Sequence, residues 1–139
     1  MDDPTDPAAY RFWTEEHVRF ADLDPLGHAN NNAIGTFFEA ARVDLFARSG
    51  NPVSGGPLGV VLARITIDFR AELHYGAPIR IGTRVVRFGR TSLDVRSAIF
   101  RGDLCAATSE GVCVLIDMEG RRPTPFPDAL RARLAEIAG

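Results

Sequence analysis

The sequence predicts a single α+β domain, residues 1–139, in which an antiparallel sheet wraps around one long helix. One strand-like segment precedes a strongly periodic helical segment in the first third of the chain, and several strand-like segments follow that helix in a row. A parallel doubly wound sheet needs strands and helices in alternation, so this order argues against it. The length of 139 residues suits one domain with one hydrophobic core.

The chain is expected to begin with a tail, a strand and a loop. Residues 1–9 are rich in Asp and Pro, which predicts a loose tail. Aromatic and β-branched residues are frequent from Tyr10 to Phe20, which favours a strand. The stretch from Asp22 to Asn32 lacks hydrophobic periodicity, and its Pro25, Gly27 and three consecutive asparagines indicate a loop.

A long helix is predicted after this loop. Its apolar residues recur at offsets of three and four and form one stripe, made of Ile34, Phe37, Phe38, Ala41 and Leu45. Asn31 or Asn32 is expected to cap the start of the helix, because asparagine side chains accept hydrogen bonds from free N–H groups there. Gly50 lies just past the expected end.

The rest of the chain predicts antiparallel strands and a short terminal helix. A Gly/Pro-rich connector at 52–59 leads into a segment whose apolar and polar residues alternate, the pattern of a half-buried strand. Gly111 is expected to mark a bulge in the last long strand. The strands are expected at 61–70, 79–88, 93–99 and 104–118, with a tight turn at Gly89-Arg90 and the terminal helix at 128–138.

Charge and cysteine content exclude several classes of protein. The net charge of −2 comes without clusters of Lys or Arg, so no nucleic-acid partner is expected. Cys105 and Cys113 share one predicted strand, about 26 Å apart, too far for a disulfide. Two free thiols, no secretory signal and no apolar run of about 20 residues predict a cytoplasmic protein without a membrane partner.

The candidate chemistry lies between residues 19 and 32. Asp22, Asp24, His28 and the three asparagines gather where free N–H groups and the positive end of the helix dipole are expected. Such a helix start stabilises an oxyanion, and a neighbouring carboxylate can act as a base or nucleophile toward an acyl carbon. The common hydrolase motifs are absent, and the three histidines lack the spacing of metal ligands, so no metal is expected.

The run Asp22-x-Asp24-x-x-Gly27-His28-x-Asn30-Asn31, followed by Phe-Phe-Glu-Ala-Ala-Arg at 37–42, resembles the hydroxybenzoyl-CoA thioesterase branch of the hotdog superfamily. The layout of the family extends over residues 14–120, whereas the specific motif covers residues 19–42. The resemblance implies a curved antiparallel sheet around one long helix, a homodimer or homotetramer with active sites between subunits, and no cofactor. It implies hydrolysis of an acyl-CoA substrate.

The resemblance also implies roles for individual residues. Asp24 takes the place of the catalytic nucleophile or general base, and the backbone N–H of Asn31 polarises the thioester carbonyl. His28 and Asn30 match positions that shape the pocket or assist a water, and Gly27 belongs to the same substrate-binding loop. The turn that approaches the CoA pyrophosphate in relatives matches Arg90, Thr91 and Ser92. Ala33-Ile34-Gly35 departs from the family, because many relatives carry a tyrosine or another bulky residue there, which leaves the acyl group open.

Structural roles compete with these functional ones. Asp24 before Pro25 is also a common turn opener, Asp22 is expected to bond loop amides, and His28 serves equally well to hold the turn. Glu39 is expected to be solvated or paired with Arg42, with a position facing the active site as the alternative. Two other functions stay open, a hotdog-fold dehydratase or hydratase and a non-catalytic acyl-CoA-binding protein.

Overall fold

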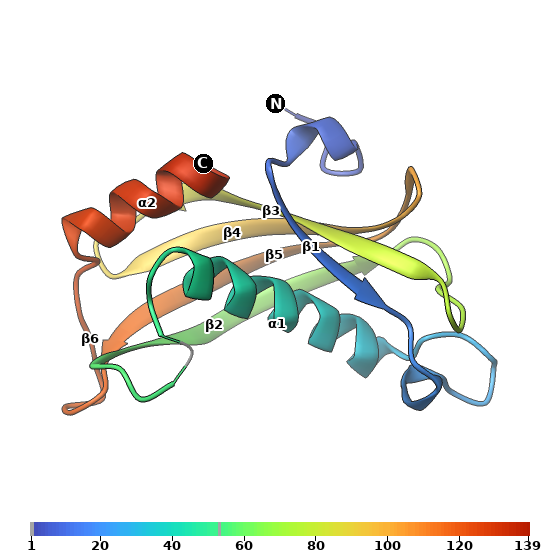
Figure 1. Ribbon diagram of the computed structural model, residues 1–139, viewed down its shortest axis with the longest axis horizontal. Coiled ribbons are helices and arrows are strands. Elements are labelled where there is room, and N and C mark those ends of the chain that lie inside the picture. The colour runs from blue at the N-terminus through green and yellow to red at the C-terminus, as the bar shows by residue number, and fades with distance from the viewer. Residues whose placement is uncertain (1, 53) are drawn as a thin grey trace.

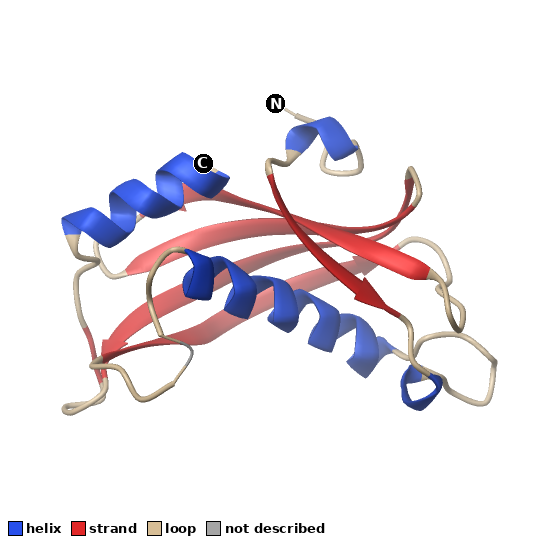
Figure 2. Ribbon diagram, in the orientation of Figure 1, coloured by secondary structure: helices blue, strands red, loops and turns tan. Residues whose placement is uncertain are grey.

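The computed structural model describes residues 2–52 and 54–139 (Figure 1). A curled antiparallel sheet in the order β1-β3-β4-β5-β2 packs around α1, which confirms the predicted α+β architecture (Figure 2). The long strands are β1 (Phe12–His17), β2 (Leu58–Phe69), β3 (Pro78–Phe88), β4 (Ser92–Arg101) and β5 (Leu104–Asp117), and a short β6 (Arg122–Pro123) pairs with β5. The helices are α1 (Asn31–Arg48) and α2 (Asp128–Ala138), with 3-10 turns η1 (Pro7–Ala9) and η2 (Phe20–Asp22).

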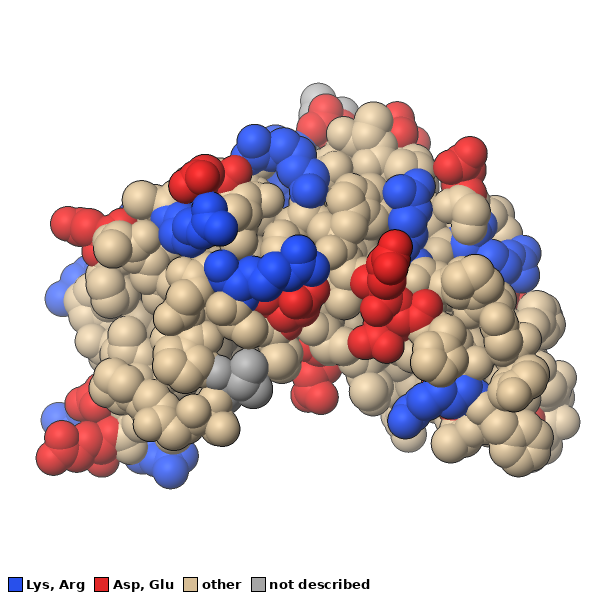
Figure 3. All heavy atoms as spheres, in the orientation of Figure 1, with Lys and Arg blue, Asp and Glu red and all other residues tan. Residues whose placement is uncertain are grey.

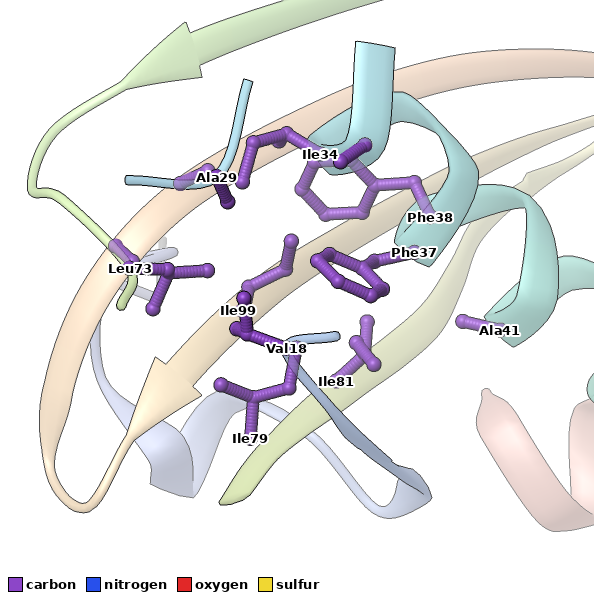
Figure 4. Close-up of a cluster of buried hydrophobic side chains, with 13 residues drawn as sticks. Val18, Ala29, Ile34, Phe37, Phe38, Ala41, Leu73, Ile79, Ile81 and Ile99 are labelled. Carbon is purple, nitrogen blue, oxygen red and sulfur yellow. The ribbon is translucent and has the colours of Figure 1, made fainter. Parts of the chain in front are cut away.

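The apolar stripe of α1 forms one half of the hydrophobic core, as its periodicity predicts. Phe37 and Phe38 point from the helix toward Ile81 and Ile99 on the concave face of the sheet (Figure 4). Phe38 is completely buried, so the helix and the sheet hold each other through the hydrophobic effect. This contact fixes the position of the whole first helical turn, where the candidate site lies.

A second cluster joins α2 to the other end of the sheet. Leu134 is fully buried against residues of α1, β3 and β5, and Leu130 and Ile137 pack beside it. The predicted bounds and apolar face of the terminal helix are therefore confirmed. No helix within 2–52 and 54–139 has the length and apolarity needed to cross a membrane.

Several local predictions differ from the structure. The segment 2–9 is held by η1 and by the Tyr10 hydroxyl, which donates to the Pro4 carbonyl at 2.7 Å, rather than forming a loose tail. The bulge of β5 falls at Ala106, whose carbonyl accepts from two consecutive amides of the chain after β2, whereas Gly111 stays in register. The predicted connector at 52–59 ends two residues early, because β2 begins at Leu58, and its Val53 lies outside the described residues.

Strand β2 departs from the predicted half-buried pattern. Its alternation is real, since Ile65 and Ile67 pack on the core, but Val61, Leu62 and Phe69 are 42%, 40% and 53% exposed. The reason is topological, because β2 forms an edge of the sheet. An edge strand that exposes both backbone and apolar side chains is unusual in an isolated domain.

Candidate functional site

Asp24 opens a tight loop between β1 and α1. A bridge between Leu23 and Ala29 closes the loop, the Asp24 N–H donates to the His28 carbonyl at 3.1 Å, and the Gly27 N–H donates to the Asp24 carbonyl at 3.0 Å. Gly27 has a φ of 85°, which a residue with a side chain rarely adopts. Glycine at this position therefore allows the chain to turn back toward the helix.

The Asp24 carboxylate is half-buried and only partly used by the loop. Oδ1 accepts from the Leu26 N–H at 2.9 Å, the bond expected of a turn-forming aspartate. Oδ2 accepts no hydrogen bond from any described residue. One oxygen of Asp24 thus holds the turn, and the other has no hydrogen-bond donor among the described residues.

Asp22 anchors the same loop from inside, as predicted. It is 4% exposed, its carboxylate accepts from the Arg19 N–H and guanidinium at 2.8 Å, and its carbonyl accepts from the Asn30 N–H at 2.9 Å. Hydrogen bonding from the Arg19 side chain lowers the pKa of Asp22, although burial opposes this shift. Asp22 therefore connects the end of β1 to the start of the helix as an ion.

The N-cap of α1 is Asn30, not Asn31 or Asn32 as predicted. The Asn30 Oδ1 accepts from the Ala33 N–H at 2.7 Å, and this bond places Asn31 and Asn32 in the exposed first turn. Among the described residues, no group accepts a hydrogen bond from the Asn31 N–H. This N–H consequently remains available at the positive end of the helix, next to the Asp24 loop.

His28 completes the loop and lies close to Glu72, a residue that the sequence analysis did not identify. Its Nδ1 lies 3.3 Å from the Ala29 carbonyl, and its Nε2 lies 3.8 Å from a carboxylate oxygen of Glu72. The other oxygen of Glu72 lies 3.5 Å from Nε2 of His74. Glu72 stands between β2 and β3, far from the motif in sequence, so no local pattern indicated this contact.

The predicted CoA-binding turn lies at the opposite end of the sheet. β3 begins beside the end of β1, near the Asp24 loop, and runs about 33 Å to Phe88. Arg90 follows there, with its carbonyl accepting from the Phe126 N–H, and the Thr91 carbonyl accepts from the Leu115 N–H. Within one chain the structure therefore does not bring Arg90, Thr91 and Ser92 near Asp24.

A cavity of about 200 Å³ lies between the second half of α1 and the strands β2 and β5. Arg42 and Glu39 line it together with apolar side chains and Cys113. Burial lowers the pKa of Arg42 and raises that of Cys113 to about 11. Within the part of the chain that the structure describes, Arg42 and Glu39 form no ion pair and Glu39 is exposed, so the solvated alternative of the prediction holds rather than the pairing.

On the face in Figure 3, positive and negative side chains are interspersed. Residues 2–52 and 54–139 contain no group of three or more His, Cys, Asp or Glu side chains placed to hold a metal ion.

Comparison with known proteins gives consistent matches over nearly the whole chain. The family model described as the thioesterase-like superfamily matches residues 18–134. A thioesterase from Thermus thermophilus, crystallised with coenzyme A and Zn, is 34% identical, with a TM-score of 0.82 over 93% of this chain and 95% of that one. No curated protein matches the sequence.

Two further solved structures share the fold at 28% identity. The PA5185 protein of Pseudomonas aeruginosa has a TM-score of 0.88, with 95% of this chain and 94% of that one covered. A predicted thioesterase of Bacillus stearothermophilus has a TM-score of 0.80, with 92% and 96% covered.

Proposed function

The chain belongs to the thioesterase-like superfamily and is a hotdog-fold thioesterase, and from this premise we propose that Asp24 and the start of α1 hydrolyse an acyl-CoA thioester. One observation carries the proposal. Asp24 holds its loop with Oδ1 and leaves Oδ2 without a described partner, beside a helix N-terminus whose Asn31 N–H is also without one. We propose that the two groups act on one substrate, Asp24 as nucleophile or base and the Asn31 N–H as oxyanion donor.

In the proposed reaction the thioester carbonyl accepts a hydrogen bond from the Asn31 N–H. As a general base, Asp24 takes a proton from water while the water oxygen bonds to the carbonyl carbon. The tetrahedral oxyanion then collapses, the C–S bond breaks, and the departing CoA sulfur takes the proton from Asp24. As a nucleophile, the Asp24 carboxylate instead forms a mixed anhydride and releases CoA as the thiolate. Water then hydrolyses the anhydride, which restores the carboxylate, and a proton from this water converts the thiolate to the thiol.

The other loop residues have supporting roles in this proposal. His28, held near Glu72, orients the water, and Asn30 fixes the direction of the first N–H groups by capping the helix. Gly27 keeps the loop open to the substrate because it adds no side chain at the turn. No metal or other cofactor enters any of these steps.

We propose that the active enzyme is at least a homodimer, formed by antiparallel pairing of β2 with the β2 strand of a second copy. The exposed edge and the exposed Val61 and Leu62 support this pairing. A two-fold axis near the middle of β2 sets the start of one strand beside the end of the other. The Arg90 turn of one subunit then approaches the Asp24 loop of the other. In the proposed dimer these two segments, which are far apart within one chain, therefore contribute to the same site.

The test of the reaction is thiol release from acetyl, hexanoyl, palmitoyl, benzoyl and phenylacetyl CoA. Asp24→Asn keeps an oxygen for the Leu26 N–H, so the loop retains its shape, but the side chain loses its basicity. We expect a fall in kcat/KM of about 10²- to 10⁴-fold. Asp103→Asn, at an exposed position on the β4–β5 turn, is the matched control and is expected to be fully active.

Two results would reject the proposed chemistry. Full turnover by Asp24→Asn would remove Asp24 from the mechanism. If the wild type releases no thiol from any of the esters, an acyl-CoA-binding role is favoured. Conversion of an enoyl-CoA without thiol release would indicate a hydratase. We also propose a cytoplasmic location, because Cys105 and Cys113 are free thiols on one strand.

A further inference from the structure

The cavity beside α1 combines an apolar wall with one half-buried cation. Val43, Phe46, Val60 and Leu62 contribute the apolar wall, and Arg42 extends into the space between α1 and β2. In the described part of the chain no carboxylate lies within ion-pair distance of the Arg42 guanidinium. A guanidinium removed from water without a counter-charge is costly, so this group favours an anionic partner.

The geometry of the proposed dimer places this cavity at the active site of the partner subunit. The cavity contacts β2 at its start, through Gly59, Val60 and Leu62. The end of β2 leads to Leu73, whose carbonyl accepts from the Ala29 N–H at 2.8 Å in the Asp24 loop. Antiparallel pairing of two β2 strands therefore brings the cavity of one copy toward the Asp24 loop of the other.

Within one chain the same cavity is less suited to the substrate of its own Asp24. Arg42 lies eleven positions after Asn31 in the helix, which corresponds to roughly 16 Å along α1. In the proposed dimer, Asp24 of the partner subunit approaches this cavity instead. Each acyl group would then be held by two subunits, with the thioester at one helix start and the acyl end in the other subunit's cavity.

We propose that Arg42 selects acyl groups that end in a free carboxylate, such as the CoA half-thioester of a dicarboxylic acid. The methylene segment of such a group contacts the apolar wall, and its carboxylate accepts from the guanidinium, which presents paired N–H donors in a planar fork. Glu39 is the other charged residue of the wall, but it is exposed and makes no described contact with Arg42. This inference rests on the proposed thioesterase reaction and on the proposed dimer.

A pair of substrates of equal chain length tests the inference, namely hexanoyl-CoA and the half-thioester of hexanedioic acid with CoA. We expect wild-type enzyme to prefer the diacid ester by about tenfold or more in kcat/KM. Arg42→Met has a similar length without charge, and we expect it to lose that preference, because kcat/KM falls much more for the diacid ester than for hexanoyl-CoA. Arg42→Lys is expected to keep part of the preference, and Arg133→Met on α2, an exposed arginine outside the cavity, to keep all of it.

Each outcome separates the inference from the function on which it rests. Hydrolysis of hexanoyl-CoA with no preference for the diacid ester overturns the inference alone. An equal loss on both esters in Arg42→Met also overturns it, because Arg42 then binds the CoA phosphates that both substrates share. Absence of hydrolysis of either ester by the wild type overturns the proposed function and the inference with it. If Arg42→Met fails to fold, Arg42→Lys decides through its ratio of kcat/KM for the diacid ester to kcat/KM for hexanoyl-CoA. A ratio equal to that of the wild type contradicts selection by Arg42.

Calorimetry gives a second readout that does not need turnover. The Asp24→Asn protein is titrated with each ester, with and without Arg42→Met. The inference is supported if the diacid ester binds more tightly than hexanoyl-CoA and Arg42→Met removes this difference. It is contradicted if the two esters bind with equal affinity both with and without Arg42→Met.

Discussion

At the scale of single residues, Asp22 and Asp24 show how position separates two identical side chains. Asp22 is buried and saturated by hydrogen bonds from Arg19, whereas Asp24 is half-buried with one oxygen unused. A carboxylate whose lone pairs are occupied is held as an ion and cannot serve as a base. Asp24 is therefore the carboxylate that we propose for the chemistry of the loop, whereas Asp22 holds the loop in shape.

The role of Asp22 gives a prediction about stability and pH. Asp22→Asn is expected to lower the free energy of unfolding by about 1–3 kcal/mol at pH 7, because hydrogen bonds to a buried carboxylate are lost. The folded pKa of Asp22 lies below its ordinary value of 3.8, so its contribution is present above that value and disappears as the pH falls through the folded pKa. Urea unfolding at pH 7 and pH 3 measures the difference.

We expect the gap in unfolding free energy between wild type and Asp22→Asn to shrink at pH 3. A gap that stays constant across this range would contradict the assignment of the effect to the Asp22 charge. Asp103→Asn, exposed at the β4–β5 turn, controls for the loss of an aspartate in general.

At the scale of elements, the start of α1 is the part that links fold to site. The stripe of Phe37 and Phe38 anchors the helix on the sheet, and the Asn30 cap directs the first free N–H groups toward the Asp24 loop. Packing and capping thus fix one helix end without using the Asn31 N–H itself. A helix dipole positioned in this way favours negative charge at that end.

The cap can be tested by comparing neighbouring asparagines. Asn30→Ala is expected to lower the free energy of unfolding by about 1 kcal/mol, because the Ala33 N–H loses its acceptor. Asn32→Ala is the matched control, since Asn32 is exposed in the first turn and its side chain caps nothing; it is expected to change the stability little. Thermal and urea unfolding of the two variants are the measurements, and equal effects would argue against Asn30 as the cap.

At the scale of the whole molecule, one chain carries the parts of the proposed site at two ends of its sheet. The Asp24 loop lies where β1 ends, whereas the Arg90 turn and the Arg42 cavity lie toward the start of β2. Within a single protomer, both are therefore less suited to the substrate of its own Asp24. The proposed pairing through β2 removes this separation and covers the exposed apolar side chains of the edge.

The proposed pairing predicts that the oligomer and the activity are lost together. Val61→Lys introduces a charge on the edge strand, which opposes strand pairing, and we expect a monomer with at least about a tenfold loss of kcat/KM. Val86→Lys, on an exposed valine of β3, is the control and is expected to leave both unchanged. Light scattering after size-exclusion chromatography reports the mass. A fully active Val61→Lys monomer would disprove the shared site.

The sequence by itself determined the features that depend on neighbours a few residues apart. The helical stripe at 34–45, the alternation along the strands and the terminal helix were predicted because side-chain periodicity follows directly from backbone geometry. The motif from Asp22 to Arg42 identified the family through the same kind of local pattern, and the family match over residues 18–134 agrees with it.

Only the tertiary structure decided what depends on residues distant in sequence. The bulge at Ala106 rather than Gly111, the approach of Glu72 to His28, the exposure of β2 and the remote position of the Arg90 turn all follow from strand order and register. Strand register is set by packing over the whole sheet, so residues close along the chain carry little information about it. Which of the three adjacent asparagines caps α1 also depends on the tertiary structure. Packing of α1 on the sheet decides at which residue the first turn begins, and this makes Asn30 the cap.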